Sequence, residues 1–126
     1  DGSLTTCHAN NPRAALTRVE DWVMMAGFEL PSTAIREQIA SAVDIIVQQS
    51  RLSDGSRKIL QISEITGREG DVILMHDIFE FVQKNIDKDG KINGYHTATG
   101  NIPYFIDEMR KNGSLKLDMS VFVPQT

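Results

Sequence analysis

Two Asp-Gly pairs, Asp54-Gly55 and Asp89-Gly90, constrain the fold of this chain more than any other feature of its sequence. Each pair lies between two runs that are rich in β-branched and apolar residues. Asp-Gly supplies the backbone conformation that a tight hairpin turn requires, so the pairs predict two β-hairpins. The strands are expected over about 45–52, 58–65, 72–82 and 91–97. Consecutive hairpins of this kind form an antiparallel meander.

Apolar residues at helical spacing flank this meander on both sides. Asn11 and Pro12 are favoured at the N-cap and at the first position of a helix, and Gly27 is favoured just beyond its end. We therefore expect a first helix from Pro12 to about residue 26. A second helix is expected over about 32–43, and a late helix over about 103–112.

The segment from Ser3 to Arg13 predicts a short strand, a polar turn and the start of the first helix. A histidine at the end of a strand, before a helix N-terminus, is typical of phosphate-sensing positions in α/β nucleotide-binding domains. The order of strand, two helices, meander and late helix suits the rear half of such a domain. We therefore expect an α/β fold and expect the chain to be a piece of a larger protein.

The composition limits the function classes that fit. The 126 residues correspond to about one domain, and the net charge of −4 disfavours nucleic acid as the main partner. Cys7 is the single cysteine, which excludes an internal disulfide. The sequence has no apolar run of the roughly 20 residues that a membrane-spanning helix needs, so no transmembrane segment is predicted.

A phosphate-binding loop requires the pattern G-x-x-x-x-G-K-[ST]. Gly90-Lys91 matches only its last glycine and lysine, with Asn85 at the first glycine position and Ile92 in place of Ser or Thr. The chain alone is therefore not expected to hydrolyse ATP or to bind a cofactor.

Metal sites are not predicted either. Residues 85–92 resemble the start of a calcium loop, but His96 stands at the twelfth position, where a bidentate glutamate is needed. The flanking runs also predict strands instead of helices, so a polar hairpin turn is the better interpretation. Cys7, His8, His76 and His96 are too scattered for a zinc site.

His8 has two interpretations that the sequence leaves open. It is either a satisfied polar residue at the end of a strand, or a phosphate sensor supported by the following helix N-terminus and by the hydroxyls of Thr5 and Thr6. A Cys7–His8 dyad is disfavoured because neighbouring side chains of a strand point to opposite faces. Arg13 lies in the first helical turn, where a bound anion would offset its unfavourable position against the helix dipole.

Several stretches together resemble the type II/type IV secretion ATPases, in particular the tight-adherence (Flp) pilus assembly branch. The stretch DGSLTTCHANNPR at 1–13 is similar to the histidine box that follows the Walker B strand of that family. Further similar stretches lie at 30–31, 34–48, 51–52, 54–57, 62–64, 69–73 and 98–100. The resemblance covers nearly the whole chain, while the family's phosphate loop, acidic boxes and N-terminal domain are absent from it.

The resemblance implies that the chain is the C-terminal half of a RecA-like P-loop ATPase domain, with an antiparallel β-meander and a late helix. Residues 1–82 would form the rear half of the nucleotide-binding core, and residues 83–126 a β-hairpin, a helix and a tail. The parent would be a bacterial, cytoplasmic motor ATPase that uses ATP and Mg²⁺ to drive pilus assembly or protein export. It would form a hexameric ring, peripheral to the inner membrane and bound to secretion platform proteins there.

Residue by residue, the resemblance makes His8 the catalytic histidine-box residue near the γ-phosphate. Thr5, Thr6 and Arg13 become candidates for nucleotide or subunit-interface contacts. Arg36, Arg51 and Arg57 also match family positions, although a solvated surface arginine is the simpler interpretation of each. The alternative hypothesis is a stand-alone protein-interaction module without nucleotide chemistry, which the missing phosphate loop favours.

Overall fold

The computed structural model describes residues 2–27, 29–113 and 116–125. Within them the chain is mixed α/β, with three α-helices, a short 3₁₀ helix and one four-stranded antiparallel sheet. The elements are α1 (Pro12–Met25), α2 (Ser32–Ala42), β1 (Ile45–Arg51), β2 (Arg57–Glu69), β3 (Val72–Ile86), β4 (Ile92–Ala98), α3 (Tyr104–Lys111) and η1 (Met119–Phe122).

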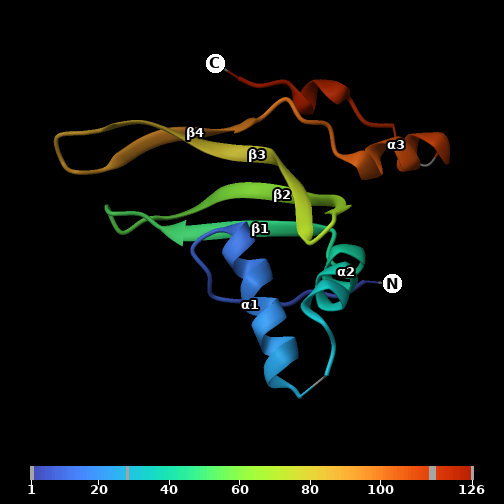
Figure 1. Ribbon diagram of the computed structural model, residues 1–126. Helices are drawn as coiled ribbons and strands as arrows, with labels where there is room; N and C mark the ends of the chain where they lie inside the picture. Colours follow the sequence, from blue (N-terminus) through green and yellow to red (C-terminus); the bar gives the residue numbers. More distant parts are fainter. Residues whose placement is uncertain (1, 28, 114–115, 126) are drawn as a thin grey trace.

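The sheet is a simple meander in the order β1-β2-β3-β4 (Figure 1). Gly55 and Gly90 adopt positive φ values of 87° and 81° in the two hairpin turns, which glycine tolerates without strain. The hairpins predicted from the two Asp-Gly pairs are thus confirmed. β3 pairs with β2 over one stretch and with β4 over another, so it joins the two hairpins into one sheet.

Two separate hydrophobic clusters lie on the sheet. The first joins α1 and α2 to β2 and β3 through Leu16, Ile35, Ile39, Ile65 and Ile73. The second is smaller and consists of the buried side chains of Ile78, Ile106 and Phe122, from β3, α3 and η1.

The two clusters lie on opposite faces of the sheet. Ile65 packs in the first cluster, whereas its neighbour Glu64 contacts the N-terminus of α3. Because neighbouring residues of a strand point to opposite faces, α1 and α2 cover one face and α3 borders the other. In Figure 1, α1 and α2 lie on the β1 side of the molecule, and α3 lies on the side of β3 and β4.

The first and second helices are confirmed close to their expected bounds. Asn11 is the N-cap of α1, and its side chain accepts a hydrogen bond from the Ala14 N–H at 2.8 Å. Gly27 follows α1 with a φ of 84°, as expected just beyond a helix end. The late helix is confirmed as α3.

The prediction of a short strand between Ser3 and His8 is wrong. Residues 2–9 have no regular secondary structure, and the side chain of Leu4 is fully exposed. A strand is stable only when a neighbouring strand takes up its backbone hydrogen bonds, and the paired sheet here begins at β1. The β-rich composition of this segment was therefore not sufficient to make a strand.

None of the helices among the described residues is long and apolar enough to cross a membrane. The expected division of the chain between residues 82 and 83 falls inside β3. The two parts are therefore joined by a continuous strand in the same sheet.

Candidate functional site

The N-terminal segment runs to α1 as an exposed chain. The side chains of Thr5, Thr6 and His8 are all exposed, and Cys7 is partly buried. The segment is attached to the sheet at its end, where the buried Gln48 amide of β1 donates a hydrogen bond to the Ala9 carbonyl oxygen at 3.0 Å. This contact fixes the point at which the chain turns into the helix.

The N-terminus of α1 satisfies most of its own donors. Asn11 accepts the Ala14 N–H through its side chain and the Ala15 N–H through its carbonyl oxygen, at 2.8 and 3.0 Å. Pro12 is buried and has no N–H to offer. A ligand at this helix end would therefore meet positive charge chiefly through the exposed Arg13.

A polar cleft of about 310 Å³ lies between this helix end and the sheet. Arg13 lines it from α1, and residues of β2 and β3 line it from the sheet. The full lining consists of Asn11, Pro12, Arg13, Gln61, Met75, His76 and Asp77. Thr5, Thr6 and His8 do not line it, so only Arg13 of the four predicted site residues reaches the cleft.

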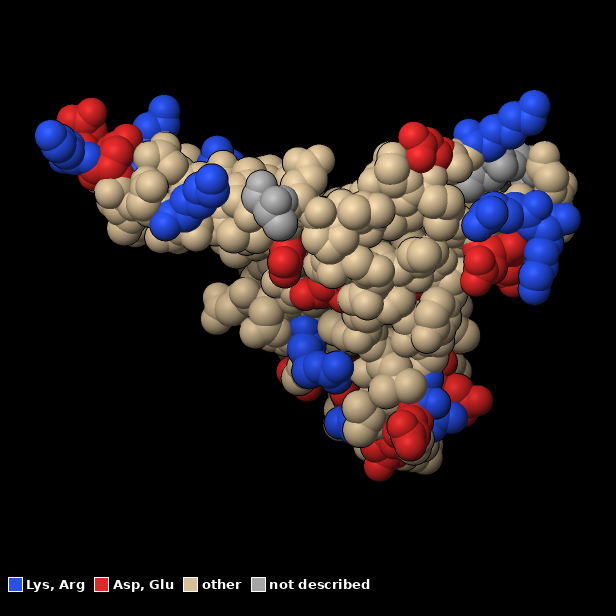
Figure 2. Space-filling view, turned by 90° about the horizontal axis from the view of Figure 1, so that it is seen from above, with Lys and Arg blue, Asp and Glu red and all other residues tan. Residues whose placement is uncertain are grey.

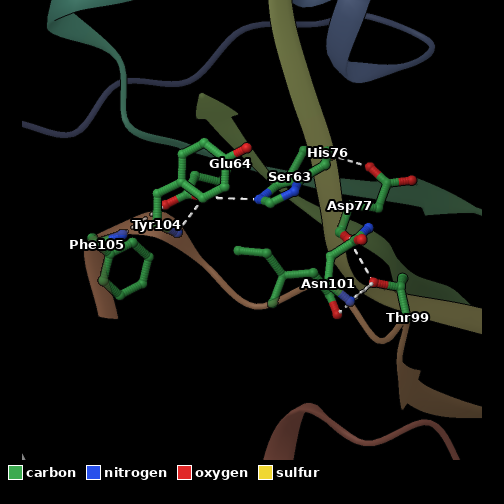
Figure 3. A network of polar contacts seen from close by, with 9 residues as sticks. Ser63, Glu64, His76, Asp77, Thr99, Asn101, Tyr104 and Phe105 are labelled. Carbon is green, nitrogen blue, oxygen red and sulfur yellow. Dashed lines mark hydrogen bonds and ion pairs between the residues drawn. The ribbon is translucent and has the colours of Figure 1, made fainter. Parts of the chain in front are cut away.

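Asp77 is the carboxylate of this cleft, and two neighbours on β2 hold it. Its Oδ1 atom accepts hydrogen bonds from Ser63 Oγ at 2.5 Å and from Gln61 Nε2 at 3.1 Å. The register places Ser63 directly opposite Asp77, which explains the short contact (Figure 3). Ser63 is completely buried, so the orientation of the carboxylate is tightly constrained.

The next pair along the same strands points to the other face. Glu64 lies opposite His76, and Glu64 Oε1 lies 2.8 Å from His76 Nε2. Glu64 also accepts the backbone N–H groups of Tyr104 and Phe105, at 2.8 and 3.3 Å. A buried carboxylate at a helix N-terminus satisfies free donors and interacts favourably with the helix dipole.

The backbone of Asp77 completes the network in Figure 3. Its carbonyl oxygen accepts hydrogen bonds from Thr99 Oγ1 at 2.5 Å and from Asn101 Nδ2 at 2.9 Å. The connection from β4 to α3 is thereby attached to β3 at the residue whose side chain lines the cleft. Asp77 and His76 both line the cleft. Asp77 bonds to the connection before α3, and His76 contacts Glu64, which accepts the first N–H group of α3.

The cleft combines opposite charges. Arg13 can attract an acidic group, and Asp77 can accept a hydrogen bond from a donor. This arrangement fits a ligand that carries an anionic group beside hydrogen-bond donors, and it disfavours a simple polyanion. In the described part of the chain, no group of three or more His, Cys, Asp or Glu side chains is placed to hold a metal ion.

An apolar groove of about 450 Å³ lies elsewhere, between the sheet and the C-terminal segment. Its apolar lining includes Ile59, Ile62, Phe79, Ala98, Val121 and Val123. In Figure 2, charged residues gather over the β3–β4 turn and over α3, and the surface between them is mostly uncharged.

Gln61, Ser63, Glu64, His76 and Asp77 were not predicted as site residues. The sequence does carry a signal for four of them, because Ser63-Glu64 and His76-Asp77 interrupt apolar runs within two strands of the meander. Polar pairs in the middle of two adjacent strands can face each other when the register aligns them. That register depends on bulges, which the sequence pattern did not predict.

Comparison of the chain with protein-family models and with curated proteins gives no match.

Proposed function

We propose that this chain is the C-terminal part of a motor ATPase of the secretion type, similar to those that assemble tight-adherence pili. The observation that carries the proposal is the resemblance of the segment from Ser3 to Arg13, with its histidine, to the histidine box of that family. The further stretches of resemblance extend over nearly the whole chain. The parent would couple ATP hydrolysis to pilus assembly or protein export as a hexameric ring in the cytoplasm, bound to platform proteins at the inner membrane.

The geometry supports this proposal at two points. His8 is exposed just before a well-capped helix, so its ring is free to meet a group from another part of the parent. Residues 2–6 and His8 are exposed and have no regular secondary structure, which suits a segment that pairs with core strands outside this chain. The antiparallel sheet and its helices would then form the rear half of a RecA-like domain.

In this proposal ATP and Mg²⁺ bind mainly to the phosphate loop and acidic boxes, which lie outside these residues. His8 donates a hydrogen bond to an oxygen of the γ-phosphate, and Thr5 and Thr6 lie beside it with their hydroxyl groups. Arg13 contributes positive charge to the nucleotide or to the neighbouring subunit. His8 would thus respond to the loss of the γ-phosphate on hydrolysis.

The test is the His8→Ala variant of the full-length protein. Because His8 is proposed to interact with the group that is transferred, ATP turnover should fall at least about tenfold while ATP binding changes little. Asn10→Ala, at an exposed neighbour, is the matched control and should behave like the wild type. Equal losses of binding and turnover, or no loss, would argue against the sensor role.

A stand-alone interaction module is the second candidate. The side chains of Trp22, Met24 and Met25 are exposed at the end of α1, and the apolar groove lies on the other face of the protein. Exposed apolar surface of this kind is typical of protein contacts. Under this alternative, the full-length protein neither binds nor hydrolyses ATP, and His8→Ala has no effect on any nucleotide assay.

A further inference from the structure

The two hairpins of the sheet separate part of the way along β2 and β3. Their pairing ends at Gln61 and Glu80, and beyond this pair the described residues of β2 pair with β1 and those of β3 with β4. In Figure 1 the two hairpins diverge towards their turns. The apolar groove of about 450 Å³ lies at this fork, because Ile59, Gln61 and Glu80 all line it.

The C-terminal segment over 120–125 bounds the groove on the side away from the sheet. This segment is held at two points. The Phe122 side chain is buried in the second hydrophobic cluster, and the Gln125 N–H donates a hydrogen bond to Thr97 Oγ1 at 2.6 Å. The groove is therefore a bounded space between fixed elements, and its volume is typical of sites for small molecules.

Apolar side chains of the groove stay open to solvent. Val121 and Val123 line it from the C-terminal segment and are 46% and 60% exposed, and Ile59 lines it from β2 and is 42% exposed. Covering apolar surface of this kind is favourable, at about 25 cal/mol for each Å² removed from water. A ligand with an apolar body would gain this free energy in the groove.

Glu80 places a negative charge in the same groove. It is the only Asp, Glu, Lys or Arg residue of the lining in the part of the chain that the structure describes. The side chain is half-buried, and no described residue forms a hydrogen bond or an ion pair with it. A carboxylate beside apolar side chains attracts a cation more strongly than one in open water, because its surroundings screen the charge less.

The polar side chains that the sheet contributes beside Glu80 already have partners within the protein. Gln61 Nε2 donates a hydrogen bond to a neighbouring carboxylate at 3.1 Å, and His96 Nε2 lies 2.9 Å from the Ile59 carbonyl oxygen. Thr97 Oγ1 donates to one backbone group and accepts from another. The Glu80 carboxylate is thus left to receive a donor from outside the protein.

We propose that the groove binds a small organic amine. Its apolar body lies against Ile59, Val121 and Val123, and its ammonium group pairs with the Glu80 carboxylate. Charge complementarity selects the cation, and the open apolar walls select the body that carries it. The bounded volume favours a small molecule over an extended polypeptide. This proposal does not depend on the proposed ATPase function or on the polar cleft at Arg13.

Titration of the whole chain with phenylbutylammonium, followed through the amide chemical shifts, tests the site. The wild type should bind this probe with a Kd of about 1 mM or lower, and the shifts should centre on Ile62, Phe79, Thr97 and Val121. Phenylbutanol keeps the apolar body without the charge, and it should bind at least about tenfold more weakly. Methylammonium has no apolar body and should not bind measurably at the same concentrations.

Glu80→Gln should weaken the binding of phenylbutylammonium at least about tenfold and leave that of phenylbutanol unchanged, because the variant removes only the charge. The variant should fold like the wild type, since the Glu80 side chain has no partner to lose. Asp21→Asn, at an exposed position of α1, is the matched control. It removes the same charge and should bind both probes as the wild type does.

Three results would each refute the proposal. The first is that the wild type binds neither probe, or binds the amine and the alcohol equally well. The second is that Glu80→Gln and Asp21→Asn change the affinity for the amine to the same extent. The third is that the shifts centre on Arg13 and Asp77, which would place the cation in the polar cleft. The comparison of the probes on the wild type is decisive even if Glu80→Gln fails to fold.

Discussion

The Asp54 carboxylate, in the turn between β1 and β2, accepts a hydrogen bond from the backbone N–H of Ile92 at the start of β4, at 2.9 Å. Its other oxygen accepts the N–H and the hydroxyl of Ser56, at 2.9 and 2.6 Å. One carboxylate thus joins the turn of the first hairpin to the second hairpin, at the end of the sheet where both turns lie (Figure 1).

These contacts predict how stability depends on pH. Hydrogen bonds from the Ser56 hydroxyl, the Ile92 N–H and the Ser56 N–H lower the pKa of Asp54 from 3.8 to about 2. A lowered pKa in the folded state means that Asp54 stabilises the fold above about pH 4 and loses this effect as the pH falls through 2. Urea unfolding of the wild type and Asp54→Asn should therefore differ at pH 6 and converge towards pH 2.

Asp89→Asn in the other hairpin turn is the control for this series. Asp89 contributes its backbone N–H to that turn, as a donor to Asp87, so the substitution of its side chain should have little effect. A difference between wild type and Asp54→Asn that stays constant from pH 6 to pH 2 would contradict the assignment.

The fold was predictable where a local rule decides it. Asp-Gly sets a hairpin wherever two β-rich runs flank it, and Asn11-Pro12 sets a helix start, because neither depends on distant residues. The strand predicted in the N-terminal segment is wrong because a strand needs a neighbouring strand to pair with. Which strands become neighbours depends on the whole fold. Its composition from Leu4 to Cys7 gives no information on whether a neighbouring strand is present.

The candidate site was predictable only in part, for a similar reason. Arg13 was placed correctly at a helix start, and the cleft forms there. The cleft's other wall comes from β2 and β3, and its polar residues meet because Ser63 and Asp77 share a register position. Bulges in the pairing of β2 and β3 set that register, and a single sequence contains no clear signal for them.

The contacts of Arg36 also join residues that are distant in the sequence, and they give a second testable prediction. A solvated arginine was expected, but Arg36 Nε contacts the buried Glu20 of α1 at 3.1 Å and Arg36 also donates to the Asp71 carbonyl oxygen. Arg36→Ala should destabilise the protein by about 1–3 kcal/mol, because Glu20 loses a charged partner inside the helix pair. Thermal unfolding measures this.

The control for that substitution is Arg18→Ala, at an exposed position of α1. It should change stability by less than about 0.5 kcal/mol. Equal effects of Arg18→Ala and Arg36→Ala would mean that the contact with Glu20 does not stabilise the fold.

Position 94 in β4 requires glycine because its neighbours leave no room for a side chain, and not because its backbone conformation is unusual. A Cβ atom at this position would overlap the Val82 carbonyl oxygen and the ring of Phe81. Gly94→Ala should destabilise the protein by about 1–3 kcal/mol, as overpacking does. Gly2→Ala meets open space and should be neutral in the same urea titration. A stable Gly94→Ala variant would show that the hairpin relaxes at no cost.

The N-cap of α1 yields a fourth prediction. Asn11→Ala removes the acceptor of the Ala14 N–H and should cost about 1 kcal/mol in urea unfolding. Asn11→Asp keeps an acceptor oxygen and should retain most of the stability. If the alanine and aspartate variants are equally unstable, the side chain acts through packing and not as a cap.

The central claim is that these residues are the rear part of a motor ATPase, and the coding sequence immediately upstream of Asp1 tests it most directly. The account predicts a G-x-x-x-x-G-K-[ST] phosphate loop there, followed by a strand that ends in acidic residues. A start codon directly before Asp1, with no phosphate loop upstream, would contradict the account and favour the interaction module.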